Sequence, residues 1–226
     1  MKCPFSLRTV LVLSAVISFT RPSIAGTATW NGGGQDNFWQ NPANWGGTPP
    51  SSGDALTFQG TVRLNNTNNF GAGTAFNGIT FASPSAAFNL FGNPINLTSD
   101  IVNNQVVVNE TINFPLTLDA THNLTVTPGG SLVIRGPIAG PAGAGLTLSG
   151  GGQATLAATN SFPGAVTINA GTLTVFSDAN LGATNASPTP GRLVINSGAL
   201  QTTNTFVIND NRGIIEGPSS GSLRLM

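Results

Sequence analysis

The sequence predicts an all-β protein folded as a parallel β-helix, a solenoid of short strands, with a tryptophan-rich cap at its N-terminal end. Apolar and polar residues alternate in short bursts, which is the period of a strand. Four related segments begin at residues 124, 146, 166 and 193, a spacing typical of the coils of a solenoid. Only 7% of the residues are charged, which suits coils that stack like residues above one another.

The first element along the chain is a leader. A basic start with Lys2 and Arg8 is followed by an apolar stretch at 10–19 and by the small residues of Ser23–Ala25. This order is that of a secretory signal peptide, and the apolar stretch is too short to span a bilayer. We expect residues 1–25 to be removed on export. The mature chain then has no Lys and no Cys and is mildly acidic.

Residues 26–60 are expected to form the cap. They contain all three tryptophans of the chain, Trp30, Trp39 and Trp45. If these rings are buried, they close the open end of the first coil, as terminal caps do in solenoids. If they are exposed, they form a platform on which a sugar ring can stack. We favour the buried cap and keep glycan stacking on the three rings as the alternative.

Residues 61–226 are expected to form the β-helical repeats. Each of the four related segments has alternating apolar residues, then a corner of small residues or glycine, then further apolar residues. The segments are Leu124–Ile134, Leu146–Leu156, Val166–Val175 and Leu193–Leu200. Many short strands also fit an antiparallel β-sandwich, which is the alternative fold, although a sandwich usually has fewer copies of one motif.

The last residues of the sequence have the pattern of strands without a following coil. These are Gly213–Gly217 and Leu223–Met226, and they suggest a repeat region truncated at its C-terminus. Unpaired backbone groups along a strand edge recruit another chain or destabilise the strand. We therefore expect either end-to-end self-association or fraying of the residues after about Asn209.

One part of the chain carries a specific pattern in three stretches: Gly145–Gly150, Thr159–Val175 and Ser177–Gly182. Together these stretches resemble the autotransporter-associated β-strand repeat of bacterial surface proteins. Two earlier stretches, Ala28–Trp45 and Ser52–Phe58, resemble the opening of large secreted proteins that carry this repeat. The resemblance implies a right-handed β-helical passenger that is exported and then displayed or released. It implies no catalytic residues, because the repeat is a structural unit.

Residues that could carry chemistry are few and dispersed. The single histidine, His122, is expected in a solvent-exposed turn with Asp119, without the nucleophile that catalysis needs. The glycine run between Asn31 and Asp36 is expected to be a turn held by these two side chains rather than a calcium loop. The carboxylates are dispersed along the sequence, whereas glycoside hydrolysis requires several on one face, which only the stacking of coils could bring together; there is no basic run for nucleic acid. No metal or cofactor is predicted.

The functional prediction is a non-enzymatic, secreted or cell-surface β-helical segment of a structural or adhesive protein. A carbohydrate-binding module that uses the tryptophan cluster is the alternative, and a polysaccharide-degrading enzyme is a third hypothesis. The expected partners are polysaccharides or other cell-surface components and, through the C-terminal end, a second copy of the chain. The mature chain contains no apolar run long enough for a transmembrane helix.

Overall fold

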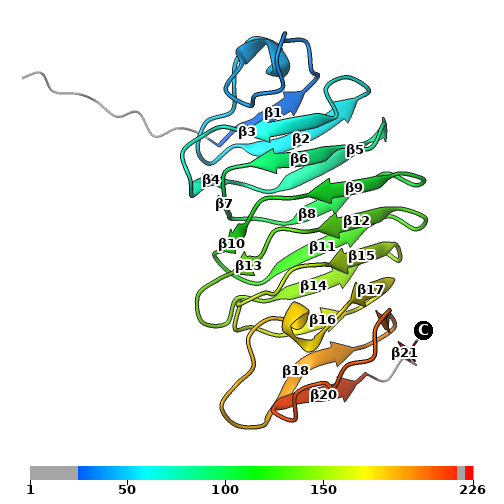
Figure 1. Cartoon of the computed structure of the whole chain (residues 1–226). Helices are drawn as coiled ribbons and strands as arrows, with labels where there is room; N and C mark the ends of the chain where they lie inside the picture. The colour runs from blue at the N-terminus through cyan, green and yellow to red at the C-terminus, as the bar shows by residue number, and fades with distance from the viewer. Residues whose placement is uncertain (1–24, 218–221, 226) are drawn as a thin grey trace, which may run out of the picture.

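The computed structural model describes residues 25–217 and 222–225, and the structural statements below concern these residues. The predicted signal peptide, residues 1–25, lies outside them except for its last residue. The described chain consists of short strands and two 3-10 helices, η1 (Pro42–Trp45) and η2 (Asp178–Leu181). The strands stack into an elongated solenoid, with the N-terminal strands at one end and the C-terminal strands at the other (Figure 1).

Three parallel sheets form the sides of this solenoid. Sheet A has nine strands, in the order β1 (Thr27–Trp30), β2 (Ala55–Gly60), β5 (Ile79–Ser85), β8 (Ile101–Asn103), β11 (His122–Val126), β14 (Leu146–Ser149), β16 (Val166–Ile168), β18 (Thr189–Ile195) and β20 (Arg212–Glu216). Sheet B has eight strands, β3 (Asn65–Asn68), β6 (Asn89–Gly92), β9 (Asn109–Ile112), β12 (Ser131–Ile134), β15 (Gln153–Leu156), β17 (Thr172–Val175), β19 (Ala199–Thr202) and β21 (Ser222–Leu225). Sheet C has four, β4 (Thr74–Phe76), β7 (Ile95–Leu97), β10 (Leu116–Leu118) and β13 (Ile138–Ala139).

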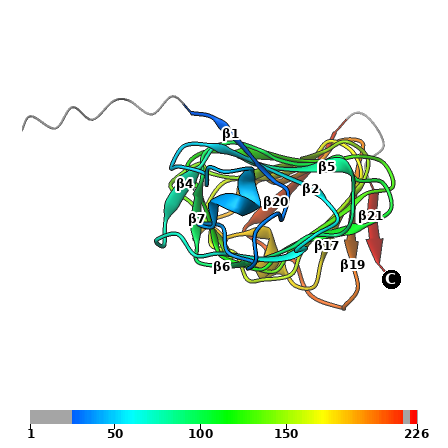
Figure 2. The same cartoon turned by 90° about the horizontal axis from the view of Figure 1, so that it is seen from above.

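The end view shows how the sheets enclose the core. Sheets A and B lie on opposite sides, and sheet C closes one of the two narrow edges between them (Figure 2). From β2 onward, consecutive strands of one sheet are separated in the sequence by strands of the other sheets, and the pairs between neighbouring strands are parallel. The predicted parallel β-solenoid is therefore confirmed, and the antiparallel sandwich is wrong.

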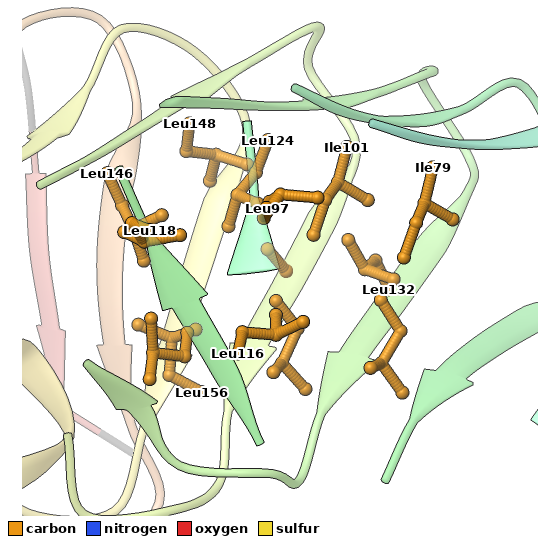
Figure 3. Close-up of a cluster of buried hydrophobic side chains, with 14 of the residues drawn as sticks. Ile79, Leu97, Ile101, Leu116, Leu118, Leu124, Leu132, Leu146, Leu148 and Leu156 are labelled. Atoms are coloured by element: carbon orange, nitrogen blue, oxygen red, sulfur yellow. The ribbon is translucent and has the colours of Figure 1, made fainter. Parts of the chain in front are cut away.

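Stacking in register explains why the sequence folds in this way. One inward column of sheet A contains only branched apolar side chains from β2 to β18, namely Leu56, Ile79, Ile101, Leu124, Leu148, Ile168 and Ile195. Every member of this column is buried. Figure 3 shows leucines and isoleucines from the middle of the solenoid meeting in its interior. Alternation with period two thus places one face of every strand in a continuous core.

The outward columns are mostly polar and almost uncharged, with valines such as Val133 and Val194 in register with the threonines. On sheet A, Thr147 of β14 pairs with Thr167 of β16, and on sheet B, Thr155 of β15 pairs with Thr174 of β17. Threonine tolerates this arrangement because its hydroxyl groups can bond to one another and to water, whereas identical charges opposite each other repel. The low charge content of the sequence therefore has a structural cause.

The corners between sheets A and B depend on small residues. Gly171, between β16 and β17, has φ +76°, a conformation that favours glycine. A Cβ atom at this position would lie 2.3 Å from the carbonyl oxygen of Gly152 in the preceding coil. The predicted glycine corner is thus required both by the backbone conformation and by the close approach of two coils.

After β13, the last strand of sheet C, buried asparagine side chains provide the hydrogen bonds that a further strand would otherwise provide. The Asn160 side chain accepts a hydrogen bond from the Ile138 amide at 2.8 Å and donates one to the Asn180 carbonyl at 2.6 Å. The Asn180 side chain in turn accepts bonds from the amides of Phe176 and Ser177. These side chains satisfy backbone groups that have no neighbouring strand, which a buried loop requires.

Candidate functional site

The segment from Asn31 to Gly47 folds over the N-terminal end of the solenoid, and we call it the cap segment. The amides of Asn31 and Gly32 donate to the Asn44 carbonyl, at 2.8 and 3.3 Å. On the side of sheet B, the Trp39 amide donates to the Thr67 carbonyl at 3.0 Å, and the Thr67 amide donates to the Asn37 carbonyl at 2.8 Å. The cap segment therefore supplies hydrogen bonds to the edge of β3, which otherwise would be open.

Trp39 and Trp45 belong to the cap segment, Trp30 precedes it at the end of β1, and the three side chains are buried together. Trp30 and Trp39 are fully buried, and Trp45 is 6% exposed. Trp45 meets both other rings edge to face, with centroids 5.2 Å from Trp30 and 6.2 Å from Trp39. The ring of Trp39 also packs against Phe58 and Phe76 of the first coils. Such contacts make the cluster the aromatic end of the core.

Two of the indole N–H groups are used inside the cap. Trp39 Nε1 donates to Asn66 Oδ1, and Trp45 Nε1 donates to the Trp39 carbonyl, both at 2.7 Å. Trp30 Nε1 is buried and has no partner in the described structure. The cluster thus has the buried arrangement expected of a cap. Stacking of a sugar on any of these rings would require the cap segment to open first.

The turn at the start of the cap segment is held by the two side chains predicted from the sequence. Asn31 Oδ1 accepts a hydrogen bond from the Gly33 amide at 2.9 Å, and Asp36 Oδ1 accepts one from the Phe38 amide at 3.0 Å. The bond from Phe38 is the main cause that lowers the pKa of Asp36. Asn44 reinforces the turn, because its side-chain amide donates to the Asp36 carbonyl.

The prediction for His122 is wrong. The residue is the first of β11, not part of an exposed turn, and its side chain is only 7% exposed. The imidazole Nε2 lies 2.7 Å from Asp119 Oδ1, and Nδ1 lies 3.7 Å from Asp100 Oδ1. Period-two alternation continues from Leu124 back to position 122, so this pattern could have indicated an inward side chain.

Other carboxylates also bind groups of the chain itself. Asp54 accepts hydrogen bonds from the amides of Gly26 and Ser51, and Asp100 accepts from both nitrogens of Asn123. These acceptors hold loop backbone in place. Asp54 and Asp100 are thus committed to structural contacts, and Asp100 shares with Asp119 the neighbourhood of the buried His122 imidazole.

Glu110 is the carboxylate that the sequence analysis missed. It begins an inward column of sheet B that continues as Leu132, Ala154, Leu173 and Leu200. Its side chain is fully buried, and Oε2 accepts a hydrogen bond from the Phe88 amide at 2.6 Å while Oε1 has no partner.

Burial determines the protonation of this group. The loss of hydration raises the pKa of Glu110 to about 7, and the bond from Phe88 offsets only part of this effect. The neutral acid is therefore the form that fits the core. The sequence pattern could have indicated that Glu110 points inward, because Ile112, two positions later on the same strand, is an inward apolar residue.

A second cluster that the sequence analysis missed lies at η2. Arg212, from β20, is buried, and its Nε lies 2.8 Å from Asp178 Oδ1. Its other nitrogens donate to the carbonyls of Leu181 and Gly182 at 2.9 Å. Arg212 thus joins the last strand of sheet A to η2, more than thirty residues earlier in the chain.

Arg192 is also buried, next to this ion pair, but it has no carboxylate partner. It donates to the Ala183 carbonyl at 2.7 Å, and its Nε is buried without a partner. Burial and the nearby charge of Arg212 lower the pKa of Arg192. No sequence pattern identified either arginine, because their neighbours come from distant coils.

The surface of the described residues contains no detected pocket and no group of three or more histidine, aspartate or glutamate side chains placed to hold a metal ion. Within the same residues, no helix is long and apolar enough to cross a membrane. The geometry thus defines a β-solenoid protein whose most elaborate local structure is the aromatic cap.

Comparison with known proteins adds no family to this description. No protein-family model matches the chain, and neither a curated protein nor a solved structure is similar to it at a significant level. The resemblance to the autotransporter-associated repeat therefore stays a prediction based on the residues that carry it.

Proposed function

We propose that the chain is a non-enzymatic β-solenoid segment that is exported and acts at the bacterial cell surface as a structural or adhesive element. One observation carries this proposal: six carboxylates bind donors of the chain itself, so each has a structural partner. They are Asp36, Asp54, Asp100, Glu110, Asp119 and Asp178. A polysaccharide-degrading enzyme instead needs carboxylates that converge on the substrate.

The outer surface supports the same proposal. The outward columns of sheets A and B present mainly hydroxyl and amide groups at the regular spacing of the strands, about 4.8 Å. A long, neutral, hydrogen-bonding surface suits contact with polysaccharides or other polymers of a cell envelope. The leader predicted at residues 1–25 gives the route to that location.

Export is tested by locating the chain in a bacterial host. We expect the wild-type chain outside the cytoplasm, accessible to protease added to intact cells or present in the medium. The matched control carries Leu11→Arg and Leu13→Arg, which interrupt the apolar part of the leader and should retain the chain in the cytoplasm. Equal cytoplasmic retention of both chains would contradict the proposed location.

Adhesion is tested with beads coated with residues 26–226. We expect these beads to bind bacterial envelopes or isolated envelope polysaccharides more than beads coated with an unrelated protein of similar charge. Release of reducing ends from the same polysaccharides would instead favour an enzyme. Binding that shifts the tryptophan fluorescence and disappears in Trp45→Ala would favour the alternative carbohydrate-binding module.

A further inference from the structure

The exposed phenylalanines of the described chain lie on one face of the solenoid. Phe38 is 46%, Phe91 is 42% and Phe176 is 37% exposed. A sequence neighbour of each is fully buried, namely Trp39, Leu90 and Val175. Because neighbouring residues of a strand point to opposite faces, the three rings point outward from sheet B. Figure 1 shows the strands of this sheet, from β3 to β17, stacked along the solenoid.

The strand register places the first two rings in one outward column. Phe38 forms a parallel bridge with Thr67 of β3, and Thr67 pairs with Phe91 of β6. The Asn113 amide donates to the Leu90 carbonyl at 2.8 Å, so the ladder continues for one residue beyond β9. Asn113 therefore follows Phe91 in the same column.

The column continues in the same way to the third ring. The amides of Arg135 and Ala157 donate to the carbonyls of Ile112 and Ile134, at 2.8 and 2.9 Å. Arg135 and Ala157 thus lie directly beyond β12 and β15, each in register with the residue before it. Phe176 is the residue directly beyond β17, so it has the same outward parity and comes next to Ala157.

Large planar groups alternate with small side chains along this column, which we call the phenylalanine column. The planar groups are those of Phe38, Phe91, Arg135 and Phe176, and the small residues between them are Thr67, Asn113 and Ala157. Neighbouring strands are about 4.8 Å apart, so a planar group recurs about every 9.6 Å and the column is about 29 Å long. The solenoid therefore presents a regular row of platforms on its outer surface.

The column beside it supplies hydrogen-bonding groups. Asn65 and Asn89 are paired on β3 and β6, and Asn89 Nδ2 donates to Asn65 Oδ1 at 3.0 Å. Both residues share the outward face with the phenylalanine column. Aromatic rings flanked by amides are the groups that sugars need, because a pyranose has apolar C–H faces and hydroxyl groups around its rim.

We propose that the phenylalanine column binds an extended, β-1,4-linked glycan that carries carboxylate groups. In such a glycan with two-fold helical symmetry, every second sugar presents the same face, and this repeat is close to two strand spacings. Every second sugar thus packs on a planar group, while the sugars between them lie over the small residues. Two sugars for each repeat of about 9.6 Å give a site of about seven sugars.

The charges along the column favour an acidic glycan. Arg135 is exposed, and no hydrogen bond or ion pair within the described residues holds its guanidinium. The carboxylates nearest to the two ends in the sequence are occupied, because Asp36 accepts from the Phe38 amide and Asp178 is bound to Arg212. A guanidinium binds a carboxylate in a bidentate way, so Arg135 is free to hold one carboxylate of the glycan.

This inference deepens the adhesive role proposed above and rests on it for the location of the protein. It differs from the alternative that uses the tryptophans, since those rings are buried beneath the surface. Binding at the phenylalanine column should therefore leave the tryptophan fluorescence unchanged.

Titration calorimetry of residues 26–226 with defined oligosaccharides tests the proposal. The probes are β-1,4-linked oligomannuronates, α-1,4-linked oligoguluronates of equal charge and length, and neutral cellohexaose. We expect the affinity for oligomannuronates to rise with length up to about seven sugars. The oligoguluronates form a buckled chain with a shorter repeat, and cellohexaose has no carboxylate. Both should bind about tenfold or more weakly than an oligomannuronate of matched length.

An exchange of two residues isolates the effect of the spacing. The double variant Thr67→Phe, Phe91→Thr keeps the composition and the number of rings but moves one ring next to Phe38. We expect it to bind oligomannuronates about tenfold more weakly than wild type, as Phe91→Ala should, because one sugar loses its ring. Phe91→Trp should retain binding. Val107→Ala, at a position that is 88% exposed but lies outside the column, should bind like wild type.

Replacement of Arg135 isolates the effect of the charge. Arg135→Gln should weaken the binding of oligomannuronates and reduce its dependence on salt, because the ion pair with the glycan is lost. The same variant should leave the weak binding of cellohexaose unchanged. Cellohexaose that binds to the wild type as tightly as an oligomannuronate would overturn the acidic glycan as the ligand.

Other results would overturn the proposal as a whole. They are equal affinities for oligomannuronates and oligoguluronates, or wild-type affinity in the exchange variant. A doubled mass in light scattering that Phe91→Ala returns to that of one chain would show that the column instead holds a second copy. Coated beads that bind envelopes equally well with and without Phe91→Ala would overturn the column as the binding site but leave the adhesive function intact.

Discussion

Replacement of Glu110 by glutamine isolates the effect of one buried carboxyl group on stability. The pKa of Glu110 is raised from 4.5 to about 7 by burial. A raised pKa in the folded state means that ionisation favours unfolding. The contribution of Glu110 to the free energy of unfolding is therefore fully present below about pH 4.5. It declines as the pH rises and is lost once the pH exceeds the folded-state pKa of about 7.

The magnitude follows from the size of the shift. One pKa unit corresponds to about 1.36 kcal/mol, so the wild-type protein should lose up to roughly 3 kcal/mol between acid and mildly alkaline pH. Glu110→Gln keeps the volume and an acceptor for the Phe88 amide but cannot ionise. It leaves buried N–H donors unpaired, which costs about 1–3 kcal/mol at acid pH. The variant should thus be less stable than wild type at low pH and comparable or more stable at high pH.

Urea unfolding of residues 26–226 across this pH range measures the effect. The difference in unfolding free energy between wild type and Glu110→Gln removes the contributions of all other groups, provided that the variant leaves them unchanged. Glu216→Gln is the control, because Glu216 is exposed and is the only other glutamate of the chain. Parallel pH profiles for wild type and Glu110→Gln would refute the argument that burial controls this group.

Four further substitutions test other parts of the structure, each by urea unfolding at neutral pH. Arg212→Met should lower the free energy of unfolding by at least about 3 kcal/mol, because it leaves the Asp178 charge and several carbonyls without their donor. Arg192→Met should leave the free energy of unfolding nearly unchanged or raise it, since the Arg192 charge has no carboxylate partner. Equal losses for the two variants would contradict this distinction. Asn180→Ala should lower the free energy of unfolding by about 2–3 kcal/mol, because it leaves two backbone amides and a carbonyl unpaired. A loss below about 0.5 kcal/mol would show that water replaces the hydrogen bonds of the asparagine side chain. Trp39→Ala should lower the free energy of unfolding by about 3–5 kcal/mol, because it creates a cavity in the cap. An unchanged midpoint of the urea transition would show that the cap unfolds separately from the solenoid.

The sequence by itself determined the architecture. Apolar residues of one parity, such as Leu146 and Leu148, can be assigned to the core without knowledge of their neighbours, because a strand exposes alternate residues on opposite faces. The repeated spacing of such pairs then predicts stacked coils. The same local rule identified the turn held by Asn31 and Asp36, since each side chain bonds to an amide two residues away.

Only the tertiary structure decided the environment of the polar core residues. His122 and Glu110 are inward because of strand parity. The hydrogen-bond partner of Glu110 is the Phe88 amide in the preceding coil, and His122 faces Asp100 of the preceding coil as well as its sequence neighbour Asp119. Arg212 reaches Asp178 across a still longer separation in the chain. These contacts depend on which coil lies above which and in what register, and loops of variable length change that register without any trace in the local pattern. Local periodicity therefore determines which face a residue occupies, whereas the stacking of coils determines what it meets there.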